Sequence, residues 1–245
     1  MNGYCYVPPE AIVDDRAVLT DGEEYRHLVR VLRKRPGDRV TFVDGTGWVY
    51  DGEIEQVGPA AVGLRVTRRR DETEPDVRVT LAPALLKGNR LDFVIEKATE
   101  IGVDGIVPMR TARTIVEQDA ASGEARRARW QRLALSAMKQ SLRSWLPPVA
   151  PVAEFSEVIA RASAYDLAVI AWEGETLDGI PAALADRPRP RRVLVLVGPE
   201  GGFDRTEVDA ARHAQVSPVS LGARRLRADT ASLVALTVLM TALEA

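Results

Sequence analysis

The sequence has very little cysteine and histidine. Of its 245 residues one is cysteine, Cys5, and two are histidine, His27 and His213. A single cysteine excludes an intramolecular disulfide and favours a reducing, cytoplasmic setting. Neither histidine belongs to a Cys/His cluster with zinc-ligand spacing, and EF-hand and HExxH patterns are missing, so we expect no metal site.

Long apolar runs and an excess of one charge are missing as well. The longest apolar stretch, 231–243, is shorter than the ~20 residues of a membrane span and contains serine and threonine, so we expect a buried helix and no membrane association. Residues 1–6 lack the pattern of a secretory signal. Lysine and arginine number 33 against 35 aspartate and glutamate, a net charge of −2, and 46% of residues are apolar. This composition is typical of a soluble globular protein and excludes intrinsic disorder.

The N-terminal part of the chain has the pattern of a small β-rich domain. Strands are expected over 39–44 and 62–67, with a loose alternation of apolar and polar residues from 48 to 57 between them. Short strands at this spacing suggest a small barrel. The charged segment 68–75 ends in a proline and is the expected linker. We therefore expect one domain over 1–72 and a second over 73–245.

The second domain alternates strands with helices. Two near-continuous apolar runs, 167–172 and 193–197, are typical of strands covered on both faces, as in a parallel α/β sheet. Further strands are expected over 77–81 and 105–109, helices over 91–101, 124–144 and 204–214, and a loop over 186–191.

A glycine-rich segment follows the expected strand 193–197. It reads Gly198-Pro199-Glu200-Gly201-Gly202-Phe203-Asp204, and Asp204 with Glu207 fits a capping box that begins a helix. Ligands of open α/β sheets lie beyond the carboxyl ends of the strands, and glycines let them approach the backbone. The segment has neither Walker A nor GxGxxG register. Taken alone, it is equally compatible with a tight turn that binds nothing.

A second segment places three arginines before the apolar C-terminal helix. A short strand expected over 219–222 is followed by Arg224, Arg225 and Arg227, and we expect Asp229 or Thr230 to cap the helix. For Asp229 a capping role and a functional role are compatible.

Together these segments resemble a known family. The pair VLVLVGPEGGF (193–203) and SLGARRLRADTA (220–231) is similar to the signature of RsmE-type 16S rRNA (uracil-N3) methyltransferases, which belong to the SPOUT superfamily. Two further segments agree, LLKGNRLDFVIEKATEIGVDGIVP (85–108) and HLVRVLRKRPGD (27–38). The resemblance spans nearly the whole chain in the expected order.

The resemblance implies a fold, a partner and a cofactor. The fold is α/β, with an N-terminal PUA-like β-barrel that holds RNA and a SPOUT methyltransferase domain that has a parallel sheet and a C-terminal trefoil knot. The molecule would be a homodimer with its C-terminal helix near the partner, although burial in its own core explains that helix equally well. S-adenosylmethionine would lie against three loops. The implied cofactor-binding residues are Ile170, Ala171, Trp172, Val197, Gly198, Glu200, Gly201, Gly202, Leu221, Gly222, Leu226 and Arg227.

The chain departs from the family pattern in two segments. Relatives commonly read LRxETA where this chain has Asp229 in place of glutamate, which keeps the charge and shortens the reach by one methylene. Relatives also tend to carry an EQSGR-like stretch where this chain reads KQSLR (139–143), which reverses the charge at Lys139. From that stretch the resemblance carries over Gln140, Ser141 and Arg143.

Basic residues are clustered although the chain as a whole is not basic. Residues 25–40 hold six basic side chains against one acidic one, and 110–145 hold eight. Clustered arginine and lysine neutralise phosphates, whereas in isolation such a cluster is more often a solvated face. His27 either contacts RNA or caps the barrel, and His213 is expected at the surface. The candidate RNA-binding residues are His27, Arg30, Arg33, Lys34, Arg35 and Arg143.

The implied reaction is methylation of N3 of one uridine near the decoding region of 16S rRNA in the small ribosomal subunit. Neutral uracil carries a proton on N3, so a positive charge nearby would stabilise the anion that forms. Arg227 is the candidate for that role. Asp229 either orients Arg227 or accepts the proton, and orientation or capping is favoured because an ordinary aspartate is a weak base.

Two other functions compete with this one. A non-catalytic RNA-binding or ribosome-assembly module that retained the cofactor-binding knot is supported only by the departures at Asp229 and Lys139. A nucleotide-binding oxidoreductase is disfavoured because the glycine loop comes late in the chain and lacks the GxGxxG register.

Overall fold

The computed structural model describes residues 3–20, 22–72, 76–115, 120–175, 178–185 and 188–244, without the side chains of 120–122 and 244. It divides into two units, one of Met1–Glu74 with Met138–Leu146 and one of Pro75–Ala137 with Pro147–Ala245. The sequence alone placed 138–146 in the second domain. In the structure this segment is bonded to the first unit, because the Tyr4 N–H donates to the Lys139 carbonyl at 3.1 Å and the Leu146 N–H to the Gly45 carbonyl at 2.9 Å.

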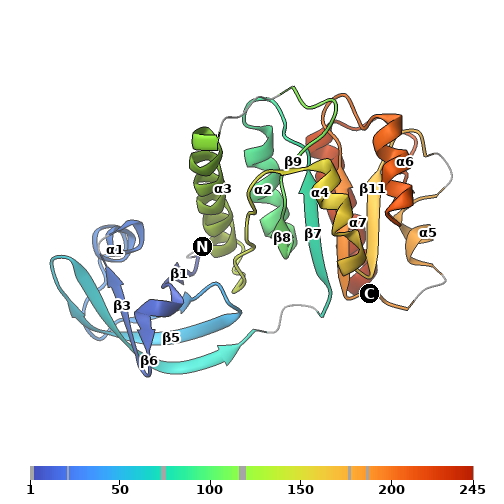
Figure 1. The fold of residues 1–245 in the computed structure, drawn as a ribbon. Helices are drawn as coiled ribbons and strands as arrows, with labels where there is room; N and C mark the ends of the chain where they lie inside the picture. Colours follow the sequence, from blue (N-terminus) through green and yellow to red (C-terminus); the bar gives the residue numbers. More distant parts are fainter. Residues whose placement is uncertain are drawn as a thin grey trace. The chain divides into compact units, whose positions relative to one another are not determined.

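The first unit is built on a six-stranded mixed sheet in the order β1-β4-β5-β6-β3-β2 (Figure 1). β1 and β4 are parallel, and the other neighbours are antiparallel. Alternate residues of the strands, among them Phe42, Ile54, Val62 and Leu64, are buried in one core, as the alternation in the sequence predicts. The strands are β1 (Cys5–Tyr6), β2 (Ile12–Val13), β3 (Arg16–Thr20), β4 (Arg39–Val43), β5 (Trp48–Val57) and β6 (Ala61–Asp71).

The prediction of a linker over 68–75 is wrong at its start. β6 continues to Asp71, and its charged residues are paired: Arg70 lies 3.1 Å from Asp51, and the Arg69 guanidinium stacks 3.5 Å from the centre of the Trp48 ring. Partners on β5 therefore keep this charged stretch in the sheet. The end of the expected linker, 73–75, lies outside the described residues, as do Asp186 and Arg187 of the expected loop.

A short helical segment covers the core of the first unit. α1 (Glu23–Arg26) continues into a π-helical turn, His27–Val31. Tyr25 and Leu28 point into the core, and the Tyr25 hydroxyl donates to the Gly58 carbonyl at 2.8 Å. Arg26 and His27, which lie between these two residues, are exposed.

The second unit contains the parallel sheet that the sequence predicts. Its strand order is β13-β11-β12-β7-β8, and every pairing is parallel. β13 lies two residues earlier than expected, which leaves 220–222 in the loop after it. The strands are β7 (Arg78–Pro83), β8 (Gly105–Ile106), β11 (Leu167–Ala171), β12 (Arg192–Val197) and β13 (Ser217–Val219), and β9 (Met109–Arg110) pairs separately with β10 (Ala153–Glu154).

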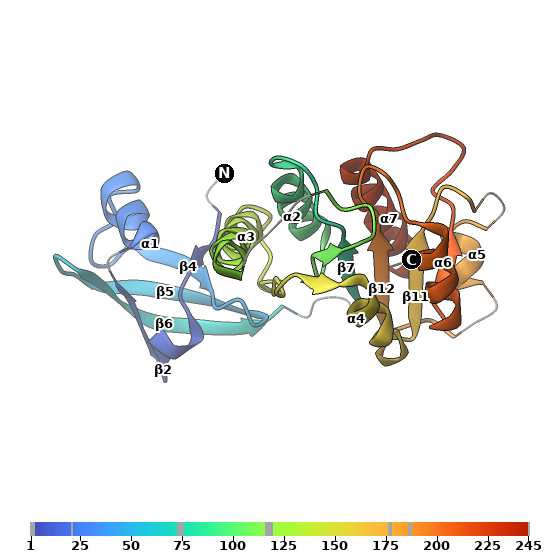
Figure 2. The same cartoon turned by 45° about the horizontal axis from the view of Figure 1, so that its top comes forward.

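Helices cover both faces of this sheet. α4 and α6 pack on the face that carries Ala82, Ile170 and Leu196, whereas α7 packs against β7 and β12 together with α2 (Figures 1 and 2). The near-continuous apolar strands follow from burial on both sides. The helices are α2 (Arg90–Ile101), α3 (Ala120–Gln140), α4 (Phe155–Ala160), α5 (Ile180–Leu184), α6 (Arg205–His213) and α7 (Ala228–Glu244).

Helix ends are where the structure departs most from the predictions. α3 ends at Gln140 rather than 144, since Leu142 adopts a φ of 60° that no helix continues through. α7 begins at Ala228, so Asp229 and Thr230 lie in its first turn and the capping position falls to Arg227. Along α7 the residues Ala235, Leu236, Leu239, Met240 and Leu243 are buried in the chain's own core. No helix of the described chain is long and apolar enough to cross a membrane.

Candidate active site

A pocket of about 740 Å³ opens at the carboxyl ends of three neighbouring strands of the parallel sheet. Ala171 ends β11, Val197 ends β12, and Ser220 follows β13, and all three line the pocket. This is the position at which open α/β sheets bind ligands, because several loops converge there. The volume lies in the range of about 300–1,000 Å³ that small-molecule sites occupy.

The pocket brings together ten of the twelve residues implied to bind the cofactor. These are Ala171, Trp172, Val197, Gly198, Glu200, Gly202, Leu221, Gly222, Leu226 and Arg227. Ile170 is fully buried in the sheet core and does not line the pocket. Gly201 does not line it either, since the position its side chain would occupy faces Arg113.

Two glycines of the 198–202 loop are needed for its shape. A Cβ on Gly198 would come within 3.2 Å of the backbone of Gly202 and Phe203, which is tighter than nine in ten real Cβ contacts. Gly202 has a φ of +68°, in the left-handed region that favours glycine. The loop therefore folds tightly back on itself, and the Gly202 N–H donates to the Pro199 carbonyl at 2.9 Å.

Ion pairs hold two carboxylates at the rim of the pocket. Glu200 Oε1 accepts hydrogen bonds from the Lys87 backbone N–H at 3.2 Å and from Arg90 at 3.3 Å. Glu173 lies 3.4 Å from Arg225. The pocket therefore offers both signs of charge, which suits a zwitterionic ligand.

Of the two candidate catalytic residues, Arg227 lines the pocket and is exposed. Asp229 is not part of the lining, within the residues described. Its carboxylate accepts hydrogen bonds from the Thr230 N–H at 2.8 Å and from the Thr230 hydroxyl at 3.4 Å. A carboxylate in the first turn of a helix is stabilised by the helix dipole, so the contacts of Asp229 are those of a helix-starting residue.

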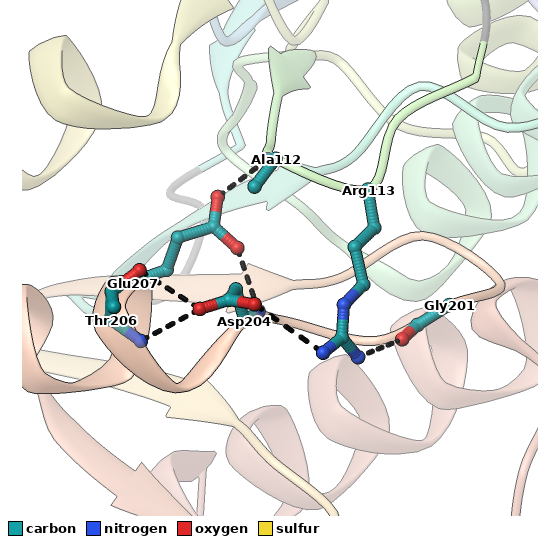
Figure 3. Close-up of polar contacts among 6 residues, drawn as sticks. All are labelled: Ala112, Arg113, Gly201, Asp204, Thr206 and Glu207. Atoms are coloured by element: carbon teal, nitrogen blue, oxygen red, sulfur yellow. Dashed lines mark hydrogen bonds and ion pairs between the residues drawn. The ribbon is translucent and has the colours of Figure 1, made fainter.

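The loop after the glycines is bound to a distant part of the chain (Figure 3). The capping box expected at Asp204 and Glu207 is present. Hydrogen bonds from the Thr206 backbone N–H and hydroxyl lower the pKa of the Asp204 carboxyl, with a smaller effect of Arg113. Glu207 also accepts a hydrogen bond from the Ala112 N–H at 2.8 Å, and Arg113 donates to the Gly201 carbonyl at 2.8 Å.

Sequence reasoning missed three charged residues at or near this site. Arg90 and Glu173 line the pocket, and Arg113 contacts the glycine loop from outside it. Arg90 stands in the family-like segment 85–108, at the start of a helix, which was a usable signal. Glu173 follows an expected strand end. Nothing local in the sequence points to Arg113, because its partner Gly201 is 88 residues away.

All six candidate RNA-binding residues belong to the first unit. His27, Arg30, Arg33 and Arg35 are exposed, and Arg143 is half-buried. Lys34 is more constrained, since its ammonium donates to the Arg39 carbonyl at 3.0 Å. Arg33 holds a φ of 54°, an uncommon backbone conformation for arginine. In the second unit, His213 is exposed at the end of α6, as expected.

The described residues contain no group of three or more His, Cys, Asp and Glu side chains that could hold a metal ion. The pocket is lined by glycines, by arginines and by two carboxylates that accept from backbone and arginine donors.

Comparisons with known proteins give a consistent set of relatives. Residues 73–240 match the model of an RNA methyltransferase domain, and residues 19–63 match that of an RNA methyltransferase PUA domain. A protein of Bacillus subtilis named ribosomal RNA small subunit methyltransferase E is 31% identical over 89% of this chain and 87% of its own length. One of the same name from Synechocystis is 34% identical over 97% of this chain and 77% of its own length.

Solved structures resemble the whole chain. A ribosomal RNA small subunit methyltransferase E from Neisseria gonorrhoeae, bound to S-adenosyl methionine, is 27% identical with a TM-score of 0.85 and covers 99% of this chain and 98% of its own. A putative methyltransferase from Legionella pneumophila in complex with SAM is also 27% identical, with a TM-score of 0.86 and the same coverage.

Proposed function

This chain belongs to the RNA methyltransferase family whose two domain models it matches, and on that premise we propose that it methylates N3 of one specific uridine in the 16S rRNA of the small ribosomal subunit, with S-adenosylmethionine as methyl donor. The observation that carries the proposal is the pocket at the carboxyl ends of β11, β12 and β13.

The residues of the pocket fit this cofactor. Gly198 and Gly202 line the pocket without side chains, which lets a ligand approach the backbone of the loop. Glu173 and Glu200 are each paired with an arginine of the pocket, and a zwitterionic ligand would share these ion pairs, its ammonium group with the carboxylates and its carboxylate with Arg90 or Arg225. Trp172 adds an aromatic face. When bound, the cofactor supplies a sulfonium methyl group that a nucleophilic nitrogen can accept.

In this proposal Arg227 stabilises the uracil anion. N3 of uracil loses its proton to solvent before or during attack, and the negative charge spreads onto O2 and O4. Arg227 is an always-charged donor on the pocket wall, which suits that role. Asp229 acts by fixing the first turn of α7 and thus the position of Arg227, a role that its bonds to Thr230 support better than proton transfer. Much of the acceleration then comes from holding the reactants in line.

The first unit would hold the RNA. Its exposed basic residues His27, Arg30, Arg33 and Arg35 sit on and after the π-helical turn, with Arg143 in the same unit. They would neutralise phosphates around a uridine that is unstacked or single-stranded. The homodimer, the trefoil knot and the cytoplasmic location implied by the resemblance complete the proposal. Light scattering of the purified protein tests the dimer directly.

Titration with S-adenosylmethionine and with NAD, followed by turnover of the Arg227→Ala variant, tests the site. The proposal predicts binding of S-adenosylmethionine and not of NAD, and loss of turnover in Arg227→Ala with cofactor binding largely kept. Near-normal turnover of that variant would remove Arg227 from the mechanism. Binding of the cofactor with no turnover by the unaltered protein on small subunits would favour the non-catalytic module instead.

A further inference from the structure

We propose that Arg113 is a positioning residue that holds the 198–202 loop in its binding shape and thereby sets the affinity of the pocket for the methyl donor. The identity of that ligand rests on the proposed function. Arg113 itself lies outside the pocket lining, in the segment that follows β9.

The Arg113 guanidinium contacts the loop at two points (Figure 3). One nitrogen donates to the Gly201 carbonyl at 2.8 Å, and another lies 3.4 Å from the Asp204 carboxylate. Glu200 and Gly202, the neighbours of Gly201, both line the pocket. The planar arginine fork therefore fixes the loop between two lining residues and ties it to the cap of α6.

The backbone that carries Arg113 is itself fixed. The Ala112 N–H donates to Glu207 Oε1 at 2.8 Å, and the other oxygen of Glu207 accepts the Asp204 N–H at 2.8 Å. Glu207 is 9% exposed, so these charge-assisted bonds are largely shielded from water. Thr111 and Thr114 close a turn around Arg113, with the Thr114 N–H donating to the Thr111 carbonyl at 3.0 Å. The backbone position of Arg113 is thus fixed by hydrogen bonds on both sides of the residue.

Gly201 has no side chain because Arg113 occupies the space. A Cβ on Gly201 would lie 3.3 Å from the Arg113 Cβ, tighter than nine in ten real Cβ contacts, and 3.4 Å from its Cδ. The φ of Gly201 is outside the positive range, so its backbone does not require glycine. The glycines of this loop therefore have separate causes. Gly198 lies against backbone, Gly202 needs its positive φ, and Gly201 admits Arg113.

The expected consequence is on affinity rather than on the chemical step. A loop already in its bound shape loses less conformational freedom when a ligand binds. Without Arg113 the Gly201 carbonyl returns to solvent, and the loop must be ordered by the ligand. Arg113 touches neither Arg227 nor the pocket, so the rate at saturating ligand is expected to be kept.

The test compares Arg113→Met, which keeps much of the stem and removes the donors, with Arg110→Met. Arg110 lies on β9 and forms an ion pair with Glu154 of β10 at 3.0 Å. For Arg113→Met we expect the Kd for S-adenosylmethionine to rise about threefold to tenfold, as for a partly exposed charge-assisted bond, with kcat at saturation unchanged. Arg113→Lys should restore part of the affinity, and Arg110→Met should bind normally.

A double-mutant cycle and a ligand-free measurement separate this from general damage. Gly201→Ala should weaken binding in the unaltered protein and much less in an Arg113→Ala background, since the clash is with the arginine. Hydrogen exchange of the Gly202 amide without ligand should speed up in Arg113→Met and not in Arg110→Met. Unchanged Kd and exchange in Arg113→Met, or equal losses in both variants, would overturn the inference. If the unaltered protein binds no S-adenosylmethionine, the proposed function fails. Hydrogen exchange of the Gly202 amide then still tests whether Arg113 holds the 198–202 loop.

Discussion

At the scale of single residues, the reversed charge at Lys139 has a structural cause. Its ammonium forms an ion pair with Glu24, and the two side chains are only 17% and 16% exposed. Both residues belong to the first unit. The family resemblance expects an acidic residue at 139, and that difference supported a non-catalytic role. A half-buried partner of opposite charge accounts for the lysine without any change of function.

This pair predicts the effect of restoring the family's charge. Lys139→Glu places two carboxylates together with little water, so we expect the free energy of unfolding to fall by about 3 kcal/mol. Exchanging the charges, with Lys139→Glu and Glu24→Lys in one protein, should recover most of it. Urea unfolding of the three proteins measures both effects. Equal stability of the single and the exchanged variant would show that the ion pair is not the cause.

The burial of Cys5 predicts that the stability of the protein falls at high pH. Burial is the main cause that raises the pKa of its thiol from 9.0 to about 12, and nearby Glu24 adds to the shift. The folded state thus keeps its proton at a pH where the unfolded state has lost it. The contribution of Cys5 to stability is therefore complete below about pH 9 and declines as the pH rises towards 12.

The rate at which a thiol reagent labels Cys5 tests the raised pKa and the burial of this thiol. At pH 8 the folded protein should react far more slowly than the urea-unfolded protein, because both the thiolate fraction and access are low. Rapid labelling of the folded protein at pH 8, at the rate of an exposed thiol, would contradict this account.

At the scale of elements, the end of α3 contains a residue in a costly conformation. Leu142 has a φ of 60° and is 50% exposed, at the position where the family's EQSGR-like stretch has glycine. A left-handed conformation costs a residue with a Cβ about 1–2 kcal/mol, whereas glycine adopts it freely. The chain pays this cost where the helix stops and 138–146 joins the first unit.

Leu142→Gly is therefore expected to stabilise the protein by about 1 kcal/mol, since little buried contact is lost and the strain is relieved. Thermal unfolding of Leu142→Gly beside Leu142→Ala tests it, because alanine shortens the side chain equally well but keeps the Cβ. A gain in both variants would assign the effect to the exposed leucine side chain rather than to the backbone.

Elements with periodic patterns were predictable, and their ends were not. Two strands and a helix show this: β11 and β12 match the apolar runs 167–172 and 193–197, and α2 matches the periodicity of 91–101. Buried positions carry apolar residues, so burial of a strand on both faces, or of a helix on one side, produces a recognisable pattern in the sequence. β6 was cut short because its arginines look like a linker until Asp51 and Trp48 are seen beside them. The glycine and arginine segments identify most of the residues that line the pocket. They do not identify Arg113, since its contacts depend on the tertiary fold alone.

At the scale of the whole molecule, we expect the first unit to bind RNA and the second to bind the cofactor, and the salt dependence of RNA binding tests this. Binding to small subunits should weaken as salt rises, and Arg30→Gln or Arg33→Gln should each reduce the slope of log K against log salt by about 0.7–0.9 for a lost phosphate contact. Arg78→Gln is the control, because Arg78 starts β7 at the end of the sheet opposite the pocket and pairs with Asp104. The same change of slope in all three variants would mean that net charge, not these residues, governs binding.

The most direct measurement is methyl transfer from labelled S-adenosylmethionine to small ribosomal subunits that lack the modification, followed by digestion of the rRNA to nucleosides. The proposed function predicts that the label appears in 3-methyluridine, and that Arg227→Ala abolishes it. Label in another nucleoside, or none although subunits and cofactor are both shown to bind, would contradict the account.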